Sequence, residues 1–395
     1  MGPPFHITML FILSLLSLLS DPVFLTPIQN DAVFHYINDQ QNEYIQRLKN
    51  WVAIESDSSD PSKRDQVNQM MEITKDYILN IGGEVEMAKI GEQEYSPGVK
   101  LPLPPVILAQ IGNDKDKPTV CFYGHMDVQP AKKDDGWKTE PYTLQETNGN
   151  LFGRGTSDDK GQVLALLHAV ESVKKFGLPV NVKLVIEGME EVGSQGLEKL
   201  VEDKKDTFFS DVDYIVVTDT PWLSTKPGIT YGARGNCYFM LEVEGAKRDL
   251  HSGGFGGTVY EAMSDLIYLL GQLVDVKGKI LIPGVYDDVV PLTEQEKELY
   301  KNLEFSLDDM QADTGVKQLL HDTKAMFNTD ADMIRAGGTI PIAKRFEEIL
   351  GKPVMLLGIG GSDDAPHGQN EKISKYNYIE GTKLYASFLQ EIPLV

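Results

Sequence analysis

Imidazole and carboxylate side chains lie beside glycine residues in several separate segments of the sequence. In His125-Met126-Asp127 the two ionisable residues are separated by one residue, so in an extended chain their side chains point the same way. A neutral imidazole can bind a metal ion through one ring nitrogen while a nearby carboxylate accepts a hydrogen bond from the other. Alone, the pair is more typical of two polar residues at the end of a strand. The other segments therefore decide whether a metal site is the better interpretation.

The segment Gly153–Gly161 combines glycines with the adjacent Asp158 and Asp159, and it leads into an apolar helix pattern. Glycine-rich loops at helix starts are typical phosphate sites. Two adjacent aspartates would repel a phosphate, however, and the spacing matches neither the P-loop nor the dinucleotide-binding motif. A carboxylate that bridges two cations fits this loop better.

A pair of glutamates, Glu190 and Glu191, follows an apolar strand pattern and lies beside glycine turns. Two adjacent ionised carboxylates at the end of a buried strand require cations or a shared proton. An isolated Glu-Glu pair is usually a solvated acidic loop, and Asp219 and His367 are uninformative singly. The argument for chemistry therefore depends on whether these segments converge.

Apolar runs typical of buried strands end shortly before most of these polar residues. The runs are Val106–Ala109, Val120–Tyr123, Val182–Ile186, Tyr214–Val217 and Val354–Leu357. Helix patterns surround them at 31–50, Asp65–Ile81 and Gln162–Lys174. This alternation predicts an α/β fold whose central sheet has substantial parallel pairing. Ligands bind beyond the carboxyl ends of the strands in such sheets, which predicts one common site.

The pattern changes from about residue 230. Residues 236–243 are typical of an antiparallel strand, and Val259–Leu273 has helical periodicity. Residues 280–325 are acidic and irregular, with one helical stretch near Glu294–Tyr300. We therefore expect a smaller domain, residues 230–325, inserted into a catalytic domain made of residues 31–229 and 326–395.

Charge and motif content narrow the class of protein. The 395 residues include 37 Lys and Arg against 59 Asp and Glu, a formal net charge of −22, without a Lys/Arg-rich run. Nucleic acid would be repelled on average, so it is not expected as a partner. The sequence contains neither G-x-S-x-G nor H-E-x-x-H, the marks of serine hydrolases and of thermolysin-type peptidases.

The N-terminus carries an apolar run, Ile7–Leu19, that is short for a bilayer span and is followed closely by Asp21-Pro22. The pattern indicates a secretory signal peptide over residues 1–20, with a signal anchor as the alternative. We expect a secreted protein without a stable membrane span.

Cys121 lies in an apolar strand pattern, which predicts a small buried side chain rather than a disulfide.

Taken in order, the ionisable segments resemble the motifs of the M20 metallopeptidase family. The matching segments are Gly124–Asp127, Gly153–Gly161, Glu187–Ser194, Asp219 and Gly361–His367. Other segments resemble the branch of this family that hydrolyses Xaa-His dipeptides such as carnosine, namely Phe122–His125, Asp249–Gly253, Thr339–Pro341 and Tyr378–Lys383. The resemblance covers nearly the whole chain after the signal. It implies a catalytic domain of the zinc-peptidase type with an inserted α+β lid and dimerisation domain.

The resemblance implies two divalent metal ions. One ion would be bound by His125, Asp158 and Asp219, and the other by Asp158, Glu191 and His367, so that Asp158 bridges the pair. Imidazole and carboxylate ligands without a thiolate suit Zn²⁺ and also Mn²⁺.

Three further roles are implied by the same resemblance. Glu190 would be the general base, and Asp127 would orient His125. His251, from the lid, would stabilise the tetrahedral oxyanion, in this family usually in the active site of a partner subunit. The segment Arg335–Pro341 resembles part of the pocket for the C-terminal half of the dipeptide.

The sequence departs from the family in the lid. Members of the dipeptidase branch are longer by roughly a hundred residues. The likeness stops after Lys324 and resumes near Met326. The absent stretch would contain later lid strands, a helix and the arginine that binds the substrate carboxylate. The lid is therefore expected to be truncated, and this argues against the homodimer that the resemblance implies.

Three functions remain as alternatives. The chain is an active secreted dipeptidase, a form that binds metal without turnover, or an M20 hydrolase of other or broader specificity such as an aminoacylase. The intact Glu190 argues against a degenerate metal centre, whereas the absent lid segment argues against full activity. The dipeptidase-like segments outside the metal motifs argue against the aminoacylase. We expect the first function.

Overall fold

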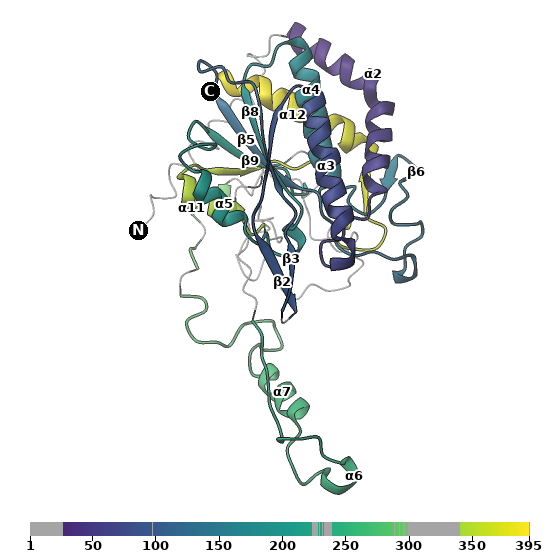
Figure 1. Cartoon of the computed structure of the whole chain (residues 1–395), viewed down its shortest axis with the longest axis vertical. Helices are drawn as coiled ribbons and strands as arrows, with labels where there is room; N and C mark the ends of the chain where they lie inside the picture. Colours follow the sequence, from purple (N-terminus) through teal and green to yellow (C-terminus); the bar gives the residue numbers. More distant parts are fainter. Residues whose placement is uncertain are drawn as a thin grey trace. The chain divides into compact units, whose positions relative to one another are not determined.

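The computed structural model describes residues 27–96, 98–222, 228, 230, 232, 239–287, 289–291, 293–294, 297–298 and 340–394. The chain forms two compact units (Figure 1). The first consists of Met1–Arg234 and Ile334–Val395, and the second of Gly235–Met333. The domain bounds expected from the sequence stay predictions, and the signal segment 1–20 lies outside the described residues.

A six-stranded sheet forms the centre of the first unit, in the order β1-β4-β8-β5-β9-β10. The strands are β1 (Glu84–Ala88), β4 (Val106–Ile111), β8 (Asn181–Glu187), β5 (Thr119–His125), β9 (Tyr214–Val217) and β10 (Val354–Leu356). Neighbours from β8 to β10 are parallel, and β4 is antiparallel to both β1 and β8. The predicted α/β fold with a mostly parallel central sheet is confirmed.

Helices cover both faces of this sheet (Figure 1). One face carries α2 (Pro27–Val52), α3 (Arg64–Asn80), α4 (Lys160–Phe176) and α12 (Lys375–Glu391). The other carries the shorter α5 (Leu197–Lys204) and α11 (Ala343–Leu350). Because neighbouring side chains of a strand point to opposite faces, Phe122 packs toward the first group and Tyr123 toward the second. Every residue of β5 is buried as a result.

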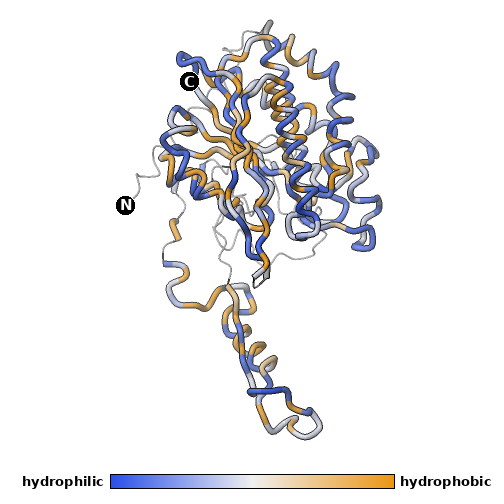
Figure 2. The backbone as a smooth tube through the Cα atoms, viewed as in Figure 1, coloured by the Kyte–Doolittle hydropathy of each residue, from blue (hydrophilic) through white to orange (hydrophobic). Residues whose placement is uncertain are grey.

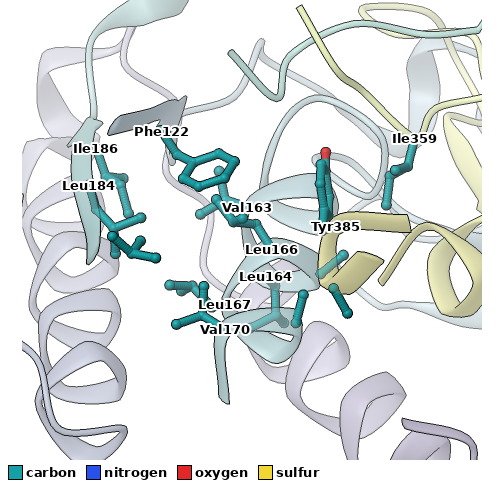
Figure 3. Close-up of a cluster of buried hydrophobic side chains, with 14 of the residues drawn as sticks. Phe122, Val163, Leu164, Leu166, Leu167, Val170, Leu184, Ile186, Ile359 and Tyr385 are labelled. Carbon is teal, nitrogen blue, oxygen red and sulfur yellow. The ribbon is translucent and has the colours of Figure 1, made fainter. Parts of the chain in front are cut away.

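The larger of the two cores is built around α4 (Figure 3). Its labelled side chains are Phe122, Val163, Leu164, Leu166, Leu167, Val170, Leu184, Ile186, Ile359 and Tyr385. Most of α4 is apolar around its circumference, as expected of a helix buried between a sheet and other helices. In Figure 2 hydrophobic colour accordingly runs through the central strands of the first unit, while hydrophobic and hydrophilic colours alternate along α2. Cys121 is buried and free, as predicted.

Smaller elements shape the loops at the edge of the sheet. A three-stranded sheet has the order β11-β7-β6, from β6 (Gln145–Thr147), β7 (Asn150–Phe152) and β11 (Lys372–Ser374). A hairpin is formed by β2 (Glu92–Ser96) and β3 (Val99–Pro102). The described part of the first unit also contains four 3-10 helices: η1 (Pro61–Lys63), η2 (Lys133–Asp135), η3 (Glu190–Val192) and η4 (Ile392–Leu394). The pairing of β7 with β11 places the C-terminal loops beside the loop that begins at Gly153.

The described residues of the second unit contain α6 (Ser252–Phe255) and α7 (Ala262–Gly271). The predicted helix Val259–Leu273 is thus confirmed with shorter bounds. The predicted strand 236–243 is wrong over 239–243, because the described part of the chain provides these residues with no strand partner; residues 236–238 lie outside the described residues. Glu294 and Lys297 are helical, as expected for that stretch.

Among the described residues of the chain, no helix combines the length and apolar character needed to cross a membrane.

A buried histidine lies where three helices of the first unit meet. His168 of α4 stacks on Tyr44 of α2, with ring centroids 3.7 Å apart and an interplanar angle of 10°. Its Nδ1 lies 2.9 Å from the hydroxyl of Tyr77 in α3. Burial lowers the pKa of His168 well below its ordinary value, and the charge of Arg47 acts in the same direction. The folded protein therefore holds this imidazole neutral.

We predict that His168 makes folding sensitive to acid. The unfolded chain takes up a proton at the ordinary histidine pKa, whereas the folded chain does not. The free energy of unfolding should therefore fall as the pH decreases below about 6.5, by up to about 1.4 kcal/mol per pH unit from this residue. Urea unfolding at pH values from about 7.5 to about 5.5 should show a shallower pH slope for His168→Phe than for the wild type. His35→Phe, at an exposed position of α2, is the control, and equal slopes for His168→Phe and the wild type would contradict the prediction.

Candidate metal centre

The predicted site residues of the first unit gather beyond the carboxyl ends of the parallel strands. His125 ends β5, in register with Glu187 at the end of β8. Asp219 follows β9 by two residues, and Glu190 and Glu191 begin η3 after β8. The loops after parallel strands open at the same edge of a sheet, so these side chains converge.

Two groups of potential ligand atoms result, and within each the atoms lie within 4.8 Å of one another. The first group is His125, Glu190 and Asp219, and the second is Asp158, Glu191 and His367. In the first group, His125 Nε2 lies 3.7 Å from Asp219 Oδ2. In the second, His367 Nε2 lies 2.9 Å from Glu191 Oε2.

Asp158 connects the two groups. Its Oδ1 lies 3.0 Å from His125 Nε2, and its Oδ2 lies 2.9 Å from His367 Nε2. One carboxylate therefore faces an imidazole on each side. Exposure increases across the centre, since the side chain of His125 is 0% exposed, that of Asp158 13% and that of His367 55%. A small molecule would therefore approach from the side of His367.

Asp127 connects the end of β5, at His125, with the glutamate pair that begins η3. Its carboxylate accepts hydrogen bonds from the backbone N–H groups of Glu190, at 3.2 Å, and Glu191, at 3.0 Å. The same carboxylate lies 3.3 Å from His125 Nδ1. A neutral His125 with its proton on Nδ1 would leave Nε2 free to bind a cation, as expected when a carboxylate contacts the other ring nitrogen. The geometry fits the orienting role that the sequence predicts for Asp127.

Burial and neighbouring charged groups shift the pKa values of the residues in this centre. Burial raises the pKa of Glu190 to about 9 and that of Asp219 to about 7. Hydrogen bonds with Asp158 and Glu191 raise the pKa of His367 to about 10. Burial opposes charge on His125, but its contacts with Asp127 and Asp158 outweigh burial and raise its pKa well above the ordinary value. Without cations the carboxylates of the centre thus favour protons, on themselves or on the two histidines.

The residues present fit two divalent cations. Each group offers imidazole nitrogen and carboxylate oxygen, and neither includes a thiolate. Positive charge at these positions would lower the pKa of the surrounding carboxylates and replace the protons that burial otherwise requires. The donor set and the central position of Asp158 therefore suit a binuclear site. The individual roles predicted from the sequence stay predictions.

Sequence reasoning missed several residues that hold the centre in place. Asp159 is fully buried and accepts hydrogen bonds from the His125 backbone N–H and the Thr218 hydroxyl, at 3.2 and 3.1 Å. Gln129 Nε2 donates to Glu191 Oε2 at 2.9 Å. Asp159 stands in a motif that was already singled out, whereas Gln129 carries no signal in the sequence.

His251 belongs to the second unit, so the structure does not place it relative to the other predicted residues. It is exposed and precedes α6, where its Nδ1 accepts a hydrogen bond from the Gly253 backbone N–H at 2.9 Å. Its predicted role at the oxyanion stays a prediction. Most of the predicted pocket segment Arg335–Pro341 lies outside the described residues.

Comparison with known proteins identifies the family. Residues 121–391 match the peptidase family M20/M25/M40. The chain is 42% identical to the Beta-Ala-His dipeptidase of Mus musculus, over 92% of this chain and 95% of that protein. The crystal structure of human carnosine dipeptidase 1 has a TM-score of 0.84 and 41% identity, and covers 93% of this chain and 100% of that one. The Cys-Gly metallodipeptidase DUG1 of Saccharomyces cerevisiae is 34% identical, over 91% of this chain and 97% of that protein. The chain therefore belongs to the M20 family, as its motifs predicted.

Close packing around the metal centre requires glycine at two positions. A Cβ atom at Gly161 would lie 1.9 Å from the Thr156 carbonyl oxygen. At Gly124 it would lie 2.4 Å from Val163 Cγ2 and 2.7 Å from Asp159 Oδ2. The Gly153–Gly161 loop and the end of β5 therefore approach their neighbours more closely than any side chain would allow.

We predict that Gly161→Ala lowers the free energy of unfolding by about 1–3 kcal/mol, because the backbone of Thr156 must move to admit the methyl group. That movement shifts the loop that carries Asp158, so the variant should also retain less metal. Urea unfolding and metal analysis of the purified chain would measure both effects. Gly271→Ala is the matched control, because no atom lies within 4 Å of a Cβ at that position of α7. The prediction would be contradicted if Gly161→Ala unfolded at the same midpoint urea concentration as the wild type.

Proposed function

We propose that the chain is a secreted dipeptidase that binds two divalent cations, Zn²⁺ or Mn²⁺, and hydrolyses Xaa-His dipeptides such as carnosine. The observation that carries the proposal is the position of Asp158, whose two carboxylate oxygens face His125 on one side and His367 on the other. A carboxylate shared in this way is what a pair of cations requires. Mixed imidazole and carboxylate ligands are common to zinc and manganese sites.

The proposed chemistry divides between the cations and the chain. Two cations about 3.5–4 Å apart would supply a shared water whose pKa is lowered. Glu190 would take the proton of the attacking water and deliver it to the leaving amine. Its backbone N–H is held by Asp127, and its carboxylate belongs to the same group of ligand atoms as His125 and Asp219. His251 of the second unit would stabilise the oxyanion that develops on the peptide carbonyl.

The substrate class is proposed from the relatives. The mouse relative is named for Beta-Ala-His, and its identity of 42% exceeds the 34% of the yeast relative named for Cys-Gly. The segments Asp249–Gly253 and Tyr378–Lys383, which resemble the Xaa-His branch, favour the first class. Cys-Gly is the second candidate, since its hydrolases are similar over most of the chain.

A shortened lid is the reason to test turnover separately from metal binding. The alignment with the mouse relative extends over 468 positions, whereas this chain has 395 residues, so that relative has residues without a counterpart here. This difference supports the proposal that part of the lid, including an arginine for the substrate carboxylate, is absent. A form that binds metal without turnover is the corresponding alternative, and the same loss argues against a homodimer.

We predict that Glu190→Gln lowers kcat for carnosine by about 10²–10⁴-fold, because glutamine cannot accept the proton of the attacking water. The variant should still bind two cations per chain, because His125 and Asp219 remain in the group that it shares. Hydrolysis of carnosine and of Cys-Gly by the purified chain, with added zinc or manganese, provides the measurement. Glu202→Gln, at an exposed position of α5, should hydrolyse at the wild-type rate.

The outcomes of this experiment separate the alternatives. Activity that resists a chelator or survives Glu190→Gln would contradict the mechanism. Faster hydrolysis of Cys-Gly than of carnosine would replace the substrate class and keep the mechanism. Two bound cations without hydrolysis of either dipeptide would favour the metal-binding form that has lost turnover.

Secretion is a separate prediction. The apolar run Ile7–Leu19 lies outside the described residues, and the proposal rests on the signal-peptide pattern alone. Expression in a eukaryotic cell should release the protein to the medium with an N-terminus close to Asp21. A variant without residues 2–20 should remain in the cytosol. Recovery of the full chain from the cytosol would contradict secretion, and recovery from membranes with the run uncleaved would indicate a signal anchor.

A further inference from the structure

A buried ion pair connects the loop of Asp158 with the loop of His367. Glu371 is 0% exposed and immediately precedes β11. Its Oε1 accepts hydrogen bonds from the backbone N–H groups of Ser157, at 2.9 Å, and Asp158, at 3.1 Å. Its Oε2 accepts from the Gly155 N–H at 3.0 Å and from Arg154 Nη1 at 2.7 Å. Each oxygen of this carboxylate therefore accepts two hydrogen bonds. Three of the four donors are backbone amides of the loop that contains Asp158.

Arg154 extends the connection to the second loop. Its Nη2 donates to the backbone carbonyls of His367 and Gly368, both at 3.2 Å. The guanidinium is 5.4 Å from the centre of the Trp137 ring, and the residue is 2% exposed. A planar guanidinium can hold a carboxylate with one nitrogen and carbonyl groups with the other, which a lysine cannot do.

The His367 loop has a backbone that needs such support. His367 adopts a φ of 61°, and Ala365 and Asn370 adopt 53° and 63°. Residues other than glycine rarely adopt this left-handed region, so the surrounding contacts have to hold the loop in place. The bond from Arg154 to the His367 carbonyl acts on the same residue whose imidazole faces Asp158.

We infer that Arg154 and Glu371 form a positioning pair that sets the distance between Asp158 and His367 and thereby the affinity for one of the two cations. The inference rests on the proposed binuclear function. Arg154 and Glu371 contact the two ligand residues, Asp158 and His367, only through backbone atoms.

His125 and the glutamate pair have a different anchor. Asp127 accepts from the Glu190 and Glu191 N–H groups and contacts the imidazole of His125. The hydrogen bonds of Glu371 do not involve these residues. Asp158 faces both histidines, but His367, whose carbonyl Arg154 holds, belongs only to the second group of ligands. Damage to the Arg154–Glu371 pair should therefore weaken the cation that His367 binds more than the cation that His125 and Asp219 bind.

The test is a metal titration of the metal-free full chain with Co²⁺, whose visible spectrum reports its coordination, and with Zn²⁺ in competition with a chelator. In Glu371→Gln the amide NH₂ would face N–H donors at a position where Glu371 accepts, so the Asp158 loop must shift. We expect about a 10–100-fold weaker affinity for the cation that His367 binds, the range found when a group that orients a ligand is removed. The loss for the other cation should be smaller, because it shares only Asp158 with the disturbed loops. Arg154→Lys keeps the charge but loses the forked contact, and it should weaken the same cation.

Glu171→Gln is the matched control. Glu171 also pairs with an arginine, through Arg47 Nη1 at 3.0 Å, but the pair joins α2 and α4. This variant should bind both cations as the wild type does.

Each outcome decides the inference. Wild-type affinity for both cations in Glu371→Gln would overturn it while leaving the proposed function in place. Equal weakening of both cations together with a lower Tm would also overturn it, because the pair would then be merely structural. If Glu371→Gln does not fold, the two affinities of Arg154→Lys decide in the same way. A wild-type chain that takes up neither Co²⁺ nor Zn²⁺ would overturn the proposed function and the inference together.

Discussion

The crowding of carboxylates at one edge of the central sheet is the constraint on which the rest of the first unit depends. Asp127, Asp158 and Glu190 lie close together there, and their common charge favours separation or protonation. A buried carboxylate is stable in its ionised form only when cations or hydrogen-bond donors offset the loss of water. His125 and His367 offset part of it through their contacts with Asp158. Divalent cations are the further positive charge that the donor set accommodates.

The fold meets this constraint mainly with backbone N–H groups. Asp127 accepts hydrogen bonds from the backbone N–H groups that begin η3. Glu371 accepts them from N–H groups of the Gly153–Gly161 loop, and Asp159 from the N–H group of His125. These amides lie in loops or at a strand end, where no neighbouring strand uses them. The edge that gathers the ligands therefore also supplies the donors that stabilise them.

The sequence predicts the part of this arrangement that depends on local patterns. Strands buried on both faces are continuous apolar runs, so Val120–Tyr123 and Tyr214–Val217 were recognisable, as was the convergence of the residues that follow them. Glu371 was not recognisable, because its contacts with the Gly155 loop join residues 216 positions apart. They depend on the pairing of β7 with β11, three-residue strands too short to show periodicity.

The predicted strand at 236–243 fails for a related reason. Alternation of apolar and polar residues indicates a strand only where a partner completes the sheet. Among the residues that the structure describes, Phe239 and Met240 have no such partner, and they are 81% and 84% exposed. A local pattern could not reveal this, because it carries no information on whether a partner strand lies beside it.

The division of the chain separates the potential metal ligands from His251. Both groups of potential ligands lie entirely in the first unit, on residues before Arg234 or after Ile334. His251 belongs to the second unit, whereas the predicted pocket segment Arg335–Pro341 belongs to the first. A change confined to the second unit thus leaves every potential metal ligand in place, together with the hydrogen bonds described around it. An intact set of ligands is therefore a strong argument for a metal centre and a weaker one for turnover, and the two properties have to be measured independently.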